Sequence, residues 1–257
     1  MEWEAPAIVL AASSYGEGGA VAHVLTEHHG AYRGLVRGGS ARANVATWQA
    51  GNLVTAHWYA RLSENLGSLK AELVHPSAAR LMQFALPLAL LSSACALADG
   101  ALPEREPHPA LFQDLVRLLT LLSLDPAQGA RAGPAALLRW ETRLLTDLGY
   151  GLDLSACAVT GSTHDLAYVS PRTGRAVSAD ASGAWRDRLL RLPRLLSDPG
   201  DDGTPADWQD GLRLTGHFLA RDVFGHRHRP VPPARERLSD MIAVLAAPAT
   251  PPEPAAG

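Results

Sequence analysis

The stretch LVTAHWYARL, at positions 53–62, decides the fold of the N-terminal third of the chain. Apolar and polar side chains alternate along it more regularly than elsewhere in the sequence. The side chains that would share one face are Val54, Ala56, Trp58, Ala60 and Leu62, and those that would share the other are Thr55, His57, Tyr59 and Arg61. A period of two residues is typical of a β-strand with one buried face. The stretch therefore predicts such a strand, with Trp58 in the core.

Four further strand-like segments surround this one. They lie at 7–12, 20–26, 31–37 and 68–73, and turn-forming residues such as SSYGEGG at 13–19 separate them. Five short strands in about 70 residues predict a small antiparallel barrel of the oligonucleotide-binding (OB) type, whose curved, half-polar sheet carries nucleic acid. An SH3-like barrel would leave a similar pattern, so the alternation alone leaves both open.

Helical periodicity dominates the rest of the chain. The segments with this spacing are 77–98, with a kink at Pro87, and 110–124, 134–148, 184–196, 207–224 and 235–245. Gly149 follows the third of these segments, where a helix C-cap belongs. The 18 residues between Arg80 and Asp99 are uncharged, but they include a proline and two serines and only just reach membrane-spanning length. A buried core helix is therefore favoured over a membrane span.

A short β-ribbon is predicted between the helices. Residues 166–170 and 175–178 flank PRTG at 171–174, which has proline early and glycine late, as a tight turn requires. The sequence therefore predicts an α+β protein in three parts. These are a five-stranded OB-fold barrel at 1–76, a mainly α-helical domain at 77–246 with the ribbon near 166–178, and a disordered tail at 247–257, which holds four prolines.

Composition and missing motifs exclude several functional classes. The 23 basic and 26 acidic residues give a net charge of −3, so any nucleic-acid site must be a local patch. Two cysteines exclude a disulfide scaffold, and the acidic N-terminus is unlike a signal peptide, which together favour the cytoplasm. The phosphate-loop, dinucleotide, nucleophile-elbow and zinc-protease motifs are all missing. We therefore expect a protein that is not an enzyme and needs no cofactor.

The predicted barrel carries the strongest candidate for a nucleic-acid site. Between Glu27 and Glu64 the chain has no acid but has four arginines with interleaved aromatic residues. Arginine neutralises phosphates, and aromatic rings stack on bases. The candidate DNA-binding residues are Arg33, Arg37, Arg42, Arg61, Tyr32, His57 and Tyr59. The alternative is that these arginines merely keep the barrel in solution.

Two later segments carry charge. A second basic patch is predicted around Arg221, Arg227 and Arg229, continued by Arg235 and Arg237, although a solvated helix end explains it equally well. The loop PEREPHP at 103–109 alternates acids and bases, and Arg105 is expected to tie two helices together there through salt bridges.

Six motifs occur in an order that resembles the RecO family of bacterial DNA repair and recombination mediators. They are YGE at 15–17, LVRGG at 35–39, QAGNLV at 49–54, PEREPH at 103–108, LGYGLDL at 148–154 and YVSPRTGRAV at 168–177. Each motif is weak alone, but their order and the strand-rich then helix-rich architecture together are specific. The resemblance extends to about residue 245.

The resemblance implies an OB barrel followed by a helical domain, and a set of partners. Such proteins bind single- and double-stranded DNA, anneal complementary strands, and work with RecR to load RecA onto DNA coated by single-strand-binding protein. They also bind the acidic C-terminal tail of that protein, and RecF takes part indirectly. The family implies work in the cytoplasm on the nucleoid, and no contact with a membrane.

One departure from the family concerns zinc. Some relatives hold zinc with two Cys-x-x-Cys pairs around the ribbon, whereas here Cys157 is followed by Thr160 where its partner would stand, and no cysteine follows the ribbon. We therefore expect no metal. A second hypothesis is that the helical domain is chiefly a docking scaffold for an acidic partner tail, with only secondary affinity for DNA.

Overall fold

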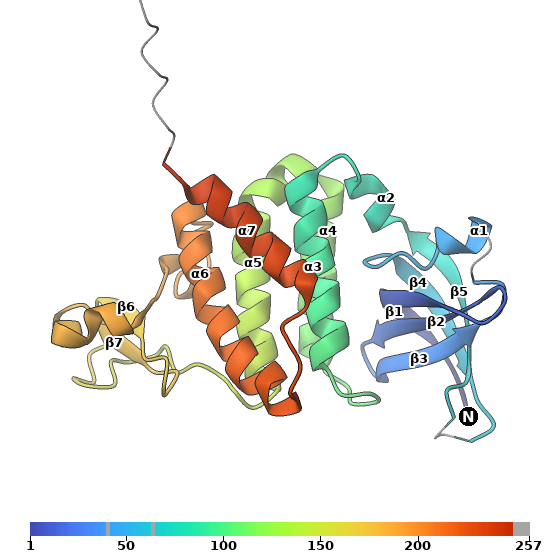
Figure 1. Ribbon diagram of the computed structural model, residues 1–257, viewed down its shortest axis with the longest axis horizontal. Coiled ribbons are helices and arrows are strands. Elements are labelled where there is room, and N and C mark those ends of the chain that lie inside the picture. The colour runs from blue at the N-terminus through green and yellow to red at the C-terminus, as the bar shows by residue number, and fades with distance from the viewer. Residues whose placement is uncertain (40–41, 63–64, 249–257) are drawn as a thin grey trace, which may run out of the picture.

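The computed structural model describes residues 1–39, 42–62 and 65–248, and leaves the side chains of Arg42 and Ala43 undescribed. It is an α+β protein, as predicted: a five-stranded barrel, a group of helices and a small sheet follow one another along its long axis (Figure 1). The predicted disordered tail lies almost wholly outside the described residues.

The barrel has the strand order of an OB fold. Its strands are β1 (Glu2–Tyr15), β2 (Gly19–Thr26), β3 (Gly30–Val36), β4 (Leu53–Tyr59) and β5 (Ser68–His75), with the short helix α1 (Arg42–Val45) between β3 and β4. They close in the order β1-β2-β3-β5-β4, which decides between the two barrels that the alternation left open. Along β4 the predicted faces are confirmed, and Trp58 is 1% exposed.

Strand β1 is much longer than the predicted strand at 7–12. Its first part pairs with β4 and its second with β2, with a register shift between Val9 and Ala11. Ala7 and Val9 point into the barrel, whereas Ile8 and Leu10 belong to the core of the helical domain. The apolar run AIVL is continuous because β1 is buried on both faces.

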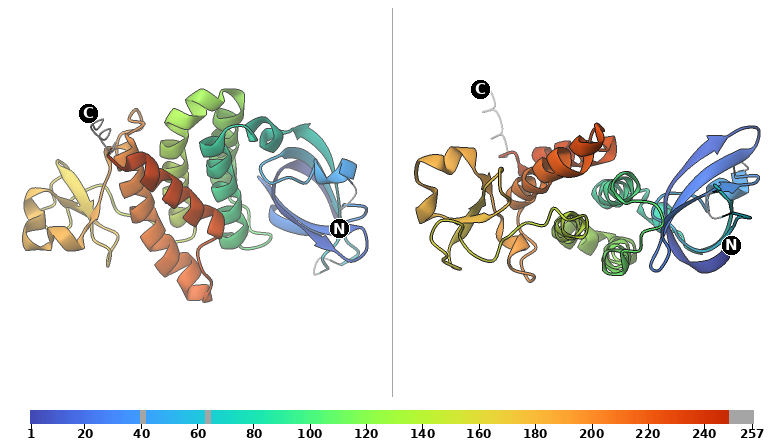
Figure 2. Two further views of the ribbon diagram at one scale, coloured as in Figure 1. Left: turned by 45° about the horizontal axis from the view of Figure 1, so that its top comes forward. Right: turned by 90° about the horizontal axis from the view of Figure 1, so that it is seen from below.

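Six helices follow the barrel. They are α2 (Ser77–Leu81), α3 (Ala85–Ala101), α4 (Pro109–Leu124), α5 (Pro126–Asp147), α6 (Pro205–Phe218) and α7 (Pro233–Ala246). Helix α4 packs antiparallel to α5, and α7 lies across α3 and α6 (Figures 1 and 2). No helix among residues 1–39, 42–62 and 65–248 is both long and apolar enough to cross a membrane.

Two predicted helix boundaries are wrong. The helix over 77–98 is broken between α2 and α3, ahead of Pro87, and that proline occupies the first turn of α3, where its missing N–H costs nothing. Helix α5 begins at Pro126 rather than 134, because the side chain of Asp125 accepts hydrogen bonds from the N–H groups of Ala127 and Gln128. Gly149 does follow the helix end, at φ +86°.

The β-ribbon is confirmed, but the helix predicted after it is wrong. Strands β6 (Leu166–Val169) and β7 (Ala176–Ser178) form the ribbon, and a third strand, β8 (Leu190–Arg191), pairs with β6. In place of a helix over 184–196, the chain makes 3₁₀ turns at Asp180–Arg188 and Arg194–Leu196 around β8. Gly183, at φ +44°, interrupts the first of these turns and prevents a continuous helix.

The loop at 103–109 joins the helical domain to the barrel, which corrects the expectation for Arg105. The backbone N–H of Arg105 donates to the carbonyl oxygen of Ala31, 2.9 Å away, and its guanidinium lies 5.4 Å from the ring centre of Tyr32. The salt bridge in this loop belongs to Glu104 instead, whose Oε1 lies 2.7 Å from Nε of Arg33. Gly30 permits the close approach, since a Cβ there would lie 2.2 Å from the carbonyl oxygen of Glu106.

Candidate nucleic-acid interface

A groove opens on the barrel where β3 and β5 diverge. These two strands pair at a single position, Leu35 with Ser68, so backbone hydrogen bonds leave the wall between them incomplete. The groove has a volume of about 830 Å³. Among its lining side chains are Arg37, His57, Tyr59 and Lys70. Three of the predicted DNA-binding residues therefore meet in one groove.

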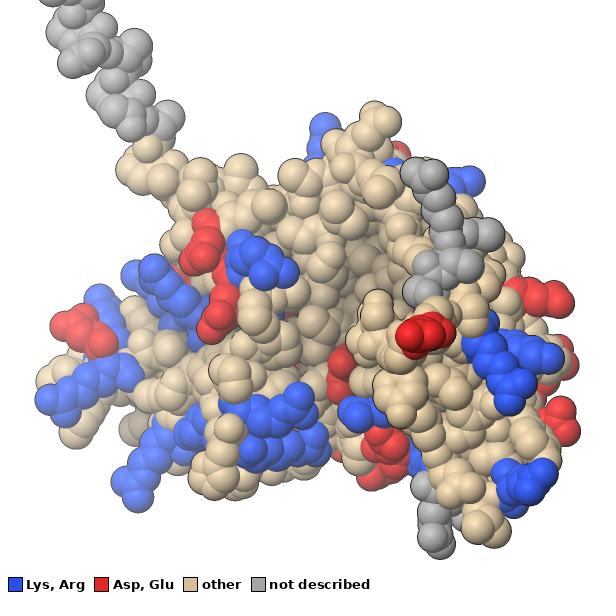
Figure 3. Space-filling model, turned by 45° about the vertical axis from the view of Figure 1, so that its right-hand side comes forward, with Lys and Arg blue, Asp and Glu red and all other residues tan. Residues whose placement is uncertain are grey.

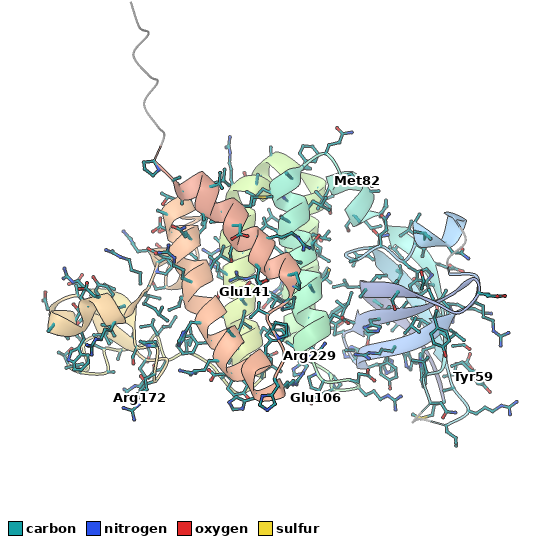
Figure 4. The ribbon with its side chains drawn as sticks, in the orientation of Figure 1. Tyr59, Met82, Glu106, Glu141, Arg172 and Arg229 are labelled. Atoms are coloured by element: carbon teal, nitrogen blue, oxygen red, sulfur yellow. The ribbon has the colours of Figure 1, made fainter. Side chains whose placement is uncertain are left out.

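The pairing of β4 with β5 sets the positions of these side chains. His57 lies opposite Lys70, and Tyr59 opposite Ser68. His57 and Tyr59 point outward because they alternate with the buried residues of β4, and Tyr59 is 51% exposed. Figure 4 shows Tyr59 on the side of the barrel that faces away from the helices. A strand of nucleic acid lying in the groove would meet an open aromatic ring.

Two cations of the groove are free for phosphates. Arg37 and Lys70 are exposed, and neither has a carboxylate partner within the described part of the chain. The loop after Arg37 is held in place, because the side-chain amide of Asn44 donates to the carbonyl oxygen of Gly38 at 2.8 Å. The groove also has acidic walls, Glu2 and Glu72, so its cations act locally rather than as a broad basic surface.

Sequence reasoning missed Lys70. It is the only lysine in the chain, and the alternation of β5 already placed it on the polar face. Its partnership with His57 across two strands depends on the register of β4 and β5, which the sequence does not contain. The signal was therefore present as a face but not as a neighbour.

The structure places the other predicted residues outside this groove. Arg33 lies on the outer face of β3, but its side chain pairs with Glu104 of the 103–109 loop. Tyr32 points inward and packs edge-to-face against Trp58, with 5.0 Å between ring centres. Arg61 is exposed in the loop after β4. The side chain of Arg42 lies outside the described residues.

The second basic patch is only partly present. Arg221 is engaged by the carboxylate of Asp222, with Nε 2.6 Å from Oδ1, and it also donates to the carbonyl oxygen of Pro171. Arg235 does not contribute to this surface, which corrects the prediction, because it is 2% exposed and pairs with Glu141. Arg227 and Arg229 remain exposed.

A cleft separates the barrel from the helices. Its volume is about 780 Å³, and its lining includes Trp48, Asp99, Phe224 and Arg229. Figure 3 shows the molecule hollowed between these two parts. Beside the cleft, Nδ1 of His23 on β2 lies 2.5 Å from the carboxylate of Asp99 on α3 and links the two parts. An apolar cleft with one arginine is the surface that the docking-scaffold hypothesis requires.

Hydrogen bonds surround Cys157 at the position where some relatives bind zinc. Its sulfur accepts the backbone N–H and the hydroxyl of Ser178, at 3.3 and 3.4 Å. Together with Tyr168 and Val177 it forms a small core under the ribbon. Across residues 1–39, 42–62 and 65–248, no three His, Cys, Asp or Glu side chains are grouped as metal ligands.

We expect the purified protein to contain far less than one zinc per chain, because one thiol without further ligands does not hold the ion. Elemental analysis by plasma mass spectrometry, after dialysis against metal-free buffer, measures this directly. Zinc at one equivalent, lost together with the fold on treatment with a chelator, would show that the ribbon is metal-bound after all.

Comparison with known proteins covers nearly the whole chain. Two family models match, "Recombination protein O N terminal" at residues 1–77 and "Recombination protein O C terminal" at residues 86–230. Proteins named "DNA repair protein RecO" from Gluconacetobacter diazotrophicus and Granulibacter bethesdensis are 66% and 58% identical over 245 and 246 residues. These alignments cover 95% of this chain in both cases, and 96% and 97% of the two relatives.

Proposed function

Because this chain belongs to the RecO family of DNA repair and recombination proteins, we propose that it binds single-stranded DNA in the barrel groove and anneals complementary strands. The observation that carries this proposal is the meeting of Arg37, Lys70 and Tyr59 in one groove on an OB barrel. Two cations and one exposed ring are suited to a flexible, charged strand with stacking bases.

The groove favours binding without sequence preference. Phosphates are the same along every strand, and every base has a face that can stack on Tyr59. Annealing follows if the cations lower the repulsion between two strands while the base edges stay free to pair. This function makes and breaks no covalent bond, so we propose that the protein acts without catalysis, on chromosomal DNA in the cytoplasm.

We also propose the partners that the family resemblance implies. With RecR, the protein would help to load RecA onto DNA coated by single-strand-binding protein, and it would bind the acidic tail of that protein. The apolar cleft beside Arg229 supports a docking role. Comparing the affinity for a tail peptide with that for an oligonucleotide separates docking from DNA binding as the primary role.

Replacing both groove cations, Arg37→Ala with Lys70→Ala, is expected to weaken binding of a fluorescent single-stranded oligonucleotide about ten- to thirtyfold. This corresponds to roughly 1 kcal/mol for each exposed charge contact. The slope of log K against log salt should fall by about 1.4, because each phosphate contact on a single strand contributes about 0.7. Fluorescence anisotropy over a salt series measures both quantities, on mixed, oligo-dT and oligo-dA sequences.

The matched control for this pair is Arg131→Ala, which removes an exposed arginine on α5, away from the groove. It should leave both affinity and slope close to those of the unaltered protein. If the groove variant behaved like this control, the strand would bind elsewhere on the molecule.

A separate prediction concerns stacking. Tyr59→Ala should weaken single-strand binding by about 1–3 kcal/mol, whereas Tyr59→Phe should retain most of the affinity, because the ring and not the hydroxyl stacks on a base. The same anisotropy assay compares the two variants. Equal losses in Tyr59→Ala and Tyr59→Phe would assign the effect to the hydroxyl group and refute stacking.

A further inference from the structure

A second basic and aromatic surface lies at the opposite end of the molecule from the barrel. It is built by the turns that replaced the predicted helix over 184–196. We call it the basic knob, and its residues are Trp185, Arg186, Arg188, Arg191 and Arg194. In Figure 4, Arg172 marks the end that carries β6 and β7, and Tyr59 marks the far side of the barrel. The barrel groove and the basic knob are therefore separated by the whole helical domain.

The knob exposes an aromatic ring together with unpaired cations. Trp185 is 63% exposed, which is unusual for so large an apolar side chain. All four arginines are exposed, and within the described residues none of them forms a salt bridge. The segment 180–196 holds these four arginines against two aspartates, Asp180 and Asp187. The knob is thus locally positive in a chain whose net charge is negative.

Cation–π contacts fix the arrangement of the guanidinium groups. That of Arg188 lies 5.3 Å from the ring centre of Trp185. Those of Arg186 and Arg191 each lie 5.9 Å from the ring centre of Tyr168, on β6. A guanidinium held over a ring keeps its N–H groups free at the edges, where they can reach phosphate oxygens.

The backbone beneath the knob is rigid. Arg191 pairs with Tyr168 in the small sheet, and the N–H of Leu192 donates to the carbonyl oxygen of Ala167 at 2.9 Å. The hydroxyl of Ser182 donates to the carbonyl oxygen of Ala179 at 2.6 Å, and so closes the turn before the exposed tryptophan. The cations and the ring are therefore presented in one fixed geometry, which lowers the entropic cost of binding.

We propose that the basic knob is a second nucleic-acid contact, at which a base stacks on Trp185 and neighbouring phosphates meet Arg186, Arg188 and Arg191. The combination of an open ring with several cations is that of a single-strand contact. An acidic peptide would seek an apolar groove as well, and neither the barrel groove nor the cleft beside Arg229 includes a knob residue. The knob therefore fits a nucleic acid better than a peptide.

Two contacts at opposite ends allow one molecule to hold two strands at once. This consequence rests on the proposed function for the first strand, in the barrel groove. The second strand, or a distant part of the same strand, would lie on the knob. Holding both raises the local concentration of one strand near the other, as any bivalent binder does.

The test is bridging of two non-complementary oligonucleotides by the full-length protein at equal molar ratio. One oligonucleotide carries an energy-transfer donor and the other an acceptor. The intact protein should bring them together, and Trp185→Ala with Arg188→Ala should lower the transfer severalfold. Trp185→Phe should retain it, and Arg131→Ala is the control for loss of an unrelated surface charge. The altered knob residues are exposed, and circular dichroism checks the fold.

The outcomes separate this inference from the proposed function. Undiminished transfer in the knob variant, together with weakened binding in the Arg37→Ala, Lys70→Ala variant, would overturn the second contact and leave the groove in place. Lost transfer in the knob variant, with full binding in the groove variant, would support the knob and refute the groove. Equal displacement of the second strand by polyglutamate and by an unlabelled oligonucleotide of the same charge would make the knob a general anionic-peptide site, and would refute the inference.

Discussion

Replacing Glu141 with alanine is expected to lower the free energy of unfolding by about 3–5 kcal/mol, a large share of what a protein of this kind has. Glu141 lies on α5 and is fully buried. Its Oε1 is 2.6 Å from Nε of Arg235 on α7, and its Oε2 accepts the hydroxyl of Thr215 on α6 at 2.5 Å. Three helices therefore meet at one carboxylate. Without it the guanidinium of Arg235 stays buried with no opposite charge.

The measurement is urea unfolding followed by circular dichroism. Arg235→Ala should cost a similar amount, whereas the paired replacement Glu141→Leu with Arg235→Met should recover much of it, because no charge then remains buried. Arg117→Ala is the control, since it breaks only the exposed pair with Asp114 and should cost about 1 kcal/mol or less. A loss as small as this control in Glu141→Ala would contradict the buried ion pair.

Replacing Leu25 with alanine is expected to cost about 2–5 kcal/mol, although it lies on a barrel strand. Leu25 is fully buried in the core of the helical domain, beside Ile8, with which it pairs between β1 and β2. Its removal opens a cavity at the junction of the barrel and the helices. Because both parts share this apolar layer, we expect them to unfold in one transition.

Val21→Ala is the matched control for Leu25, because it truncates a half-buried side chain of the same strand, outside the shared layer. It should cost under about 1 kcal/mol. Urea unfolding, followed by tryptophan fluorescence and by circular dichroism, reports whether the two parts unfold together. An equal cost in both variants, or separate transitions in the unaltered protein, would show that the barrel and the helices are energetically independent.

The sequence predicts most of the barrel, because a strand with one buried face carries its own signature. The alternation around Trp58 correctly separates the buried from the outward side chains of β4. Strand β1 escapes this reasoning because both of its faces are buried, so the apolar run AIVL shows no alternation. The segment 184–196 is misread as a helix because its leucines serve turns and a short strand, and a glycine interrupts it.

The candidate site divides along the same line. His57 and Tyr59 are found from the sequence because their exposure follows from the period of one strand. The pairing of Arg33 with Glu104 is not visible in the sequence, because 103–109 reaches the barrel only through the tertiary fold. Arg235 looks like surface charge for the same reason, since its partner Glu141 lies on another helix. Residue type and period locate a face, but not the neighbour across it.

Annealing of complementary oligonucleotides, without ATP or added metal and over a salt series, tests the central claim most directly. We predict that the protein accelerates annealing at low salt and that the acceleration fades as salt rises. It should be strongly reduced in the Arg37→Ala, Lys70→Ala variant and unchanged in Arg131→Ala. No acceleration at low salt by the folded protein, or full acceleration by the groove variant, would contradict the account.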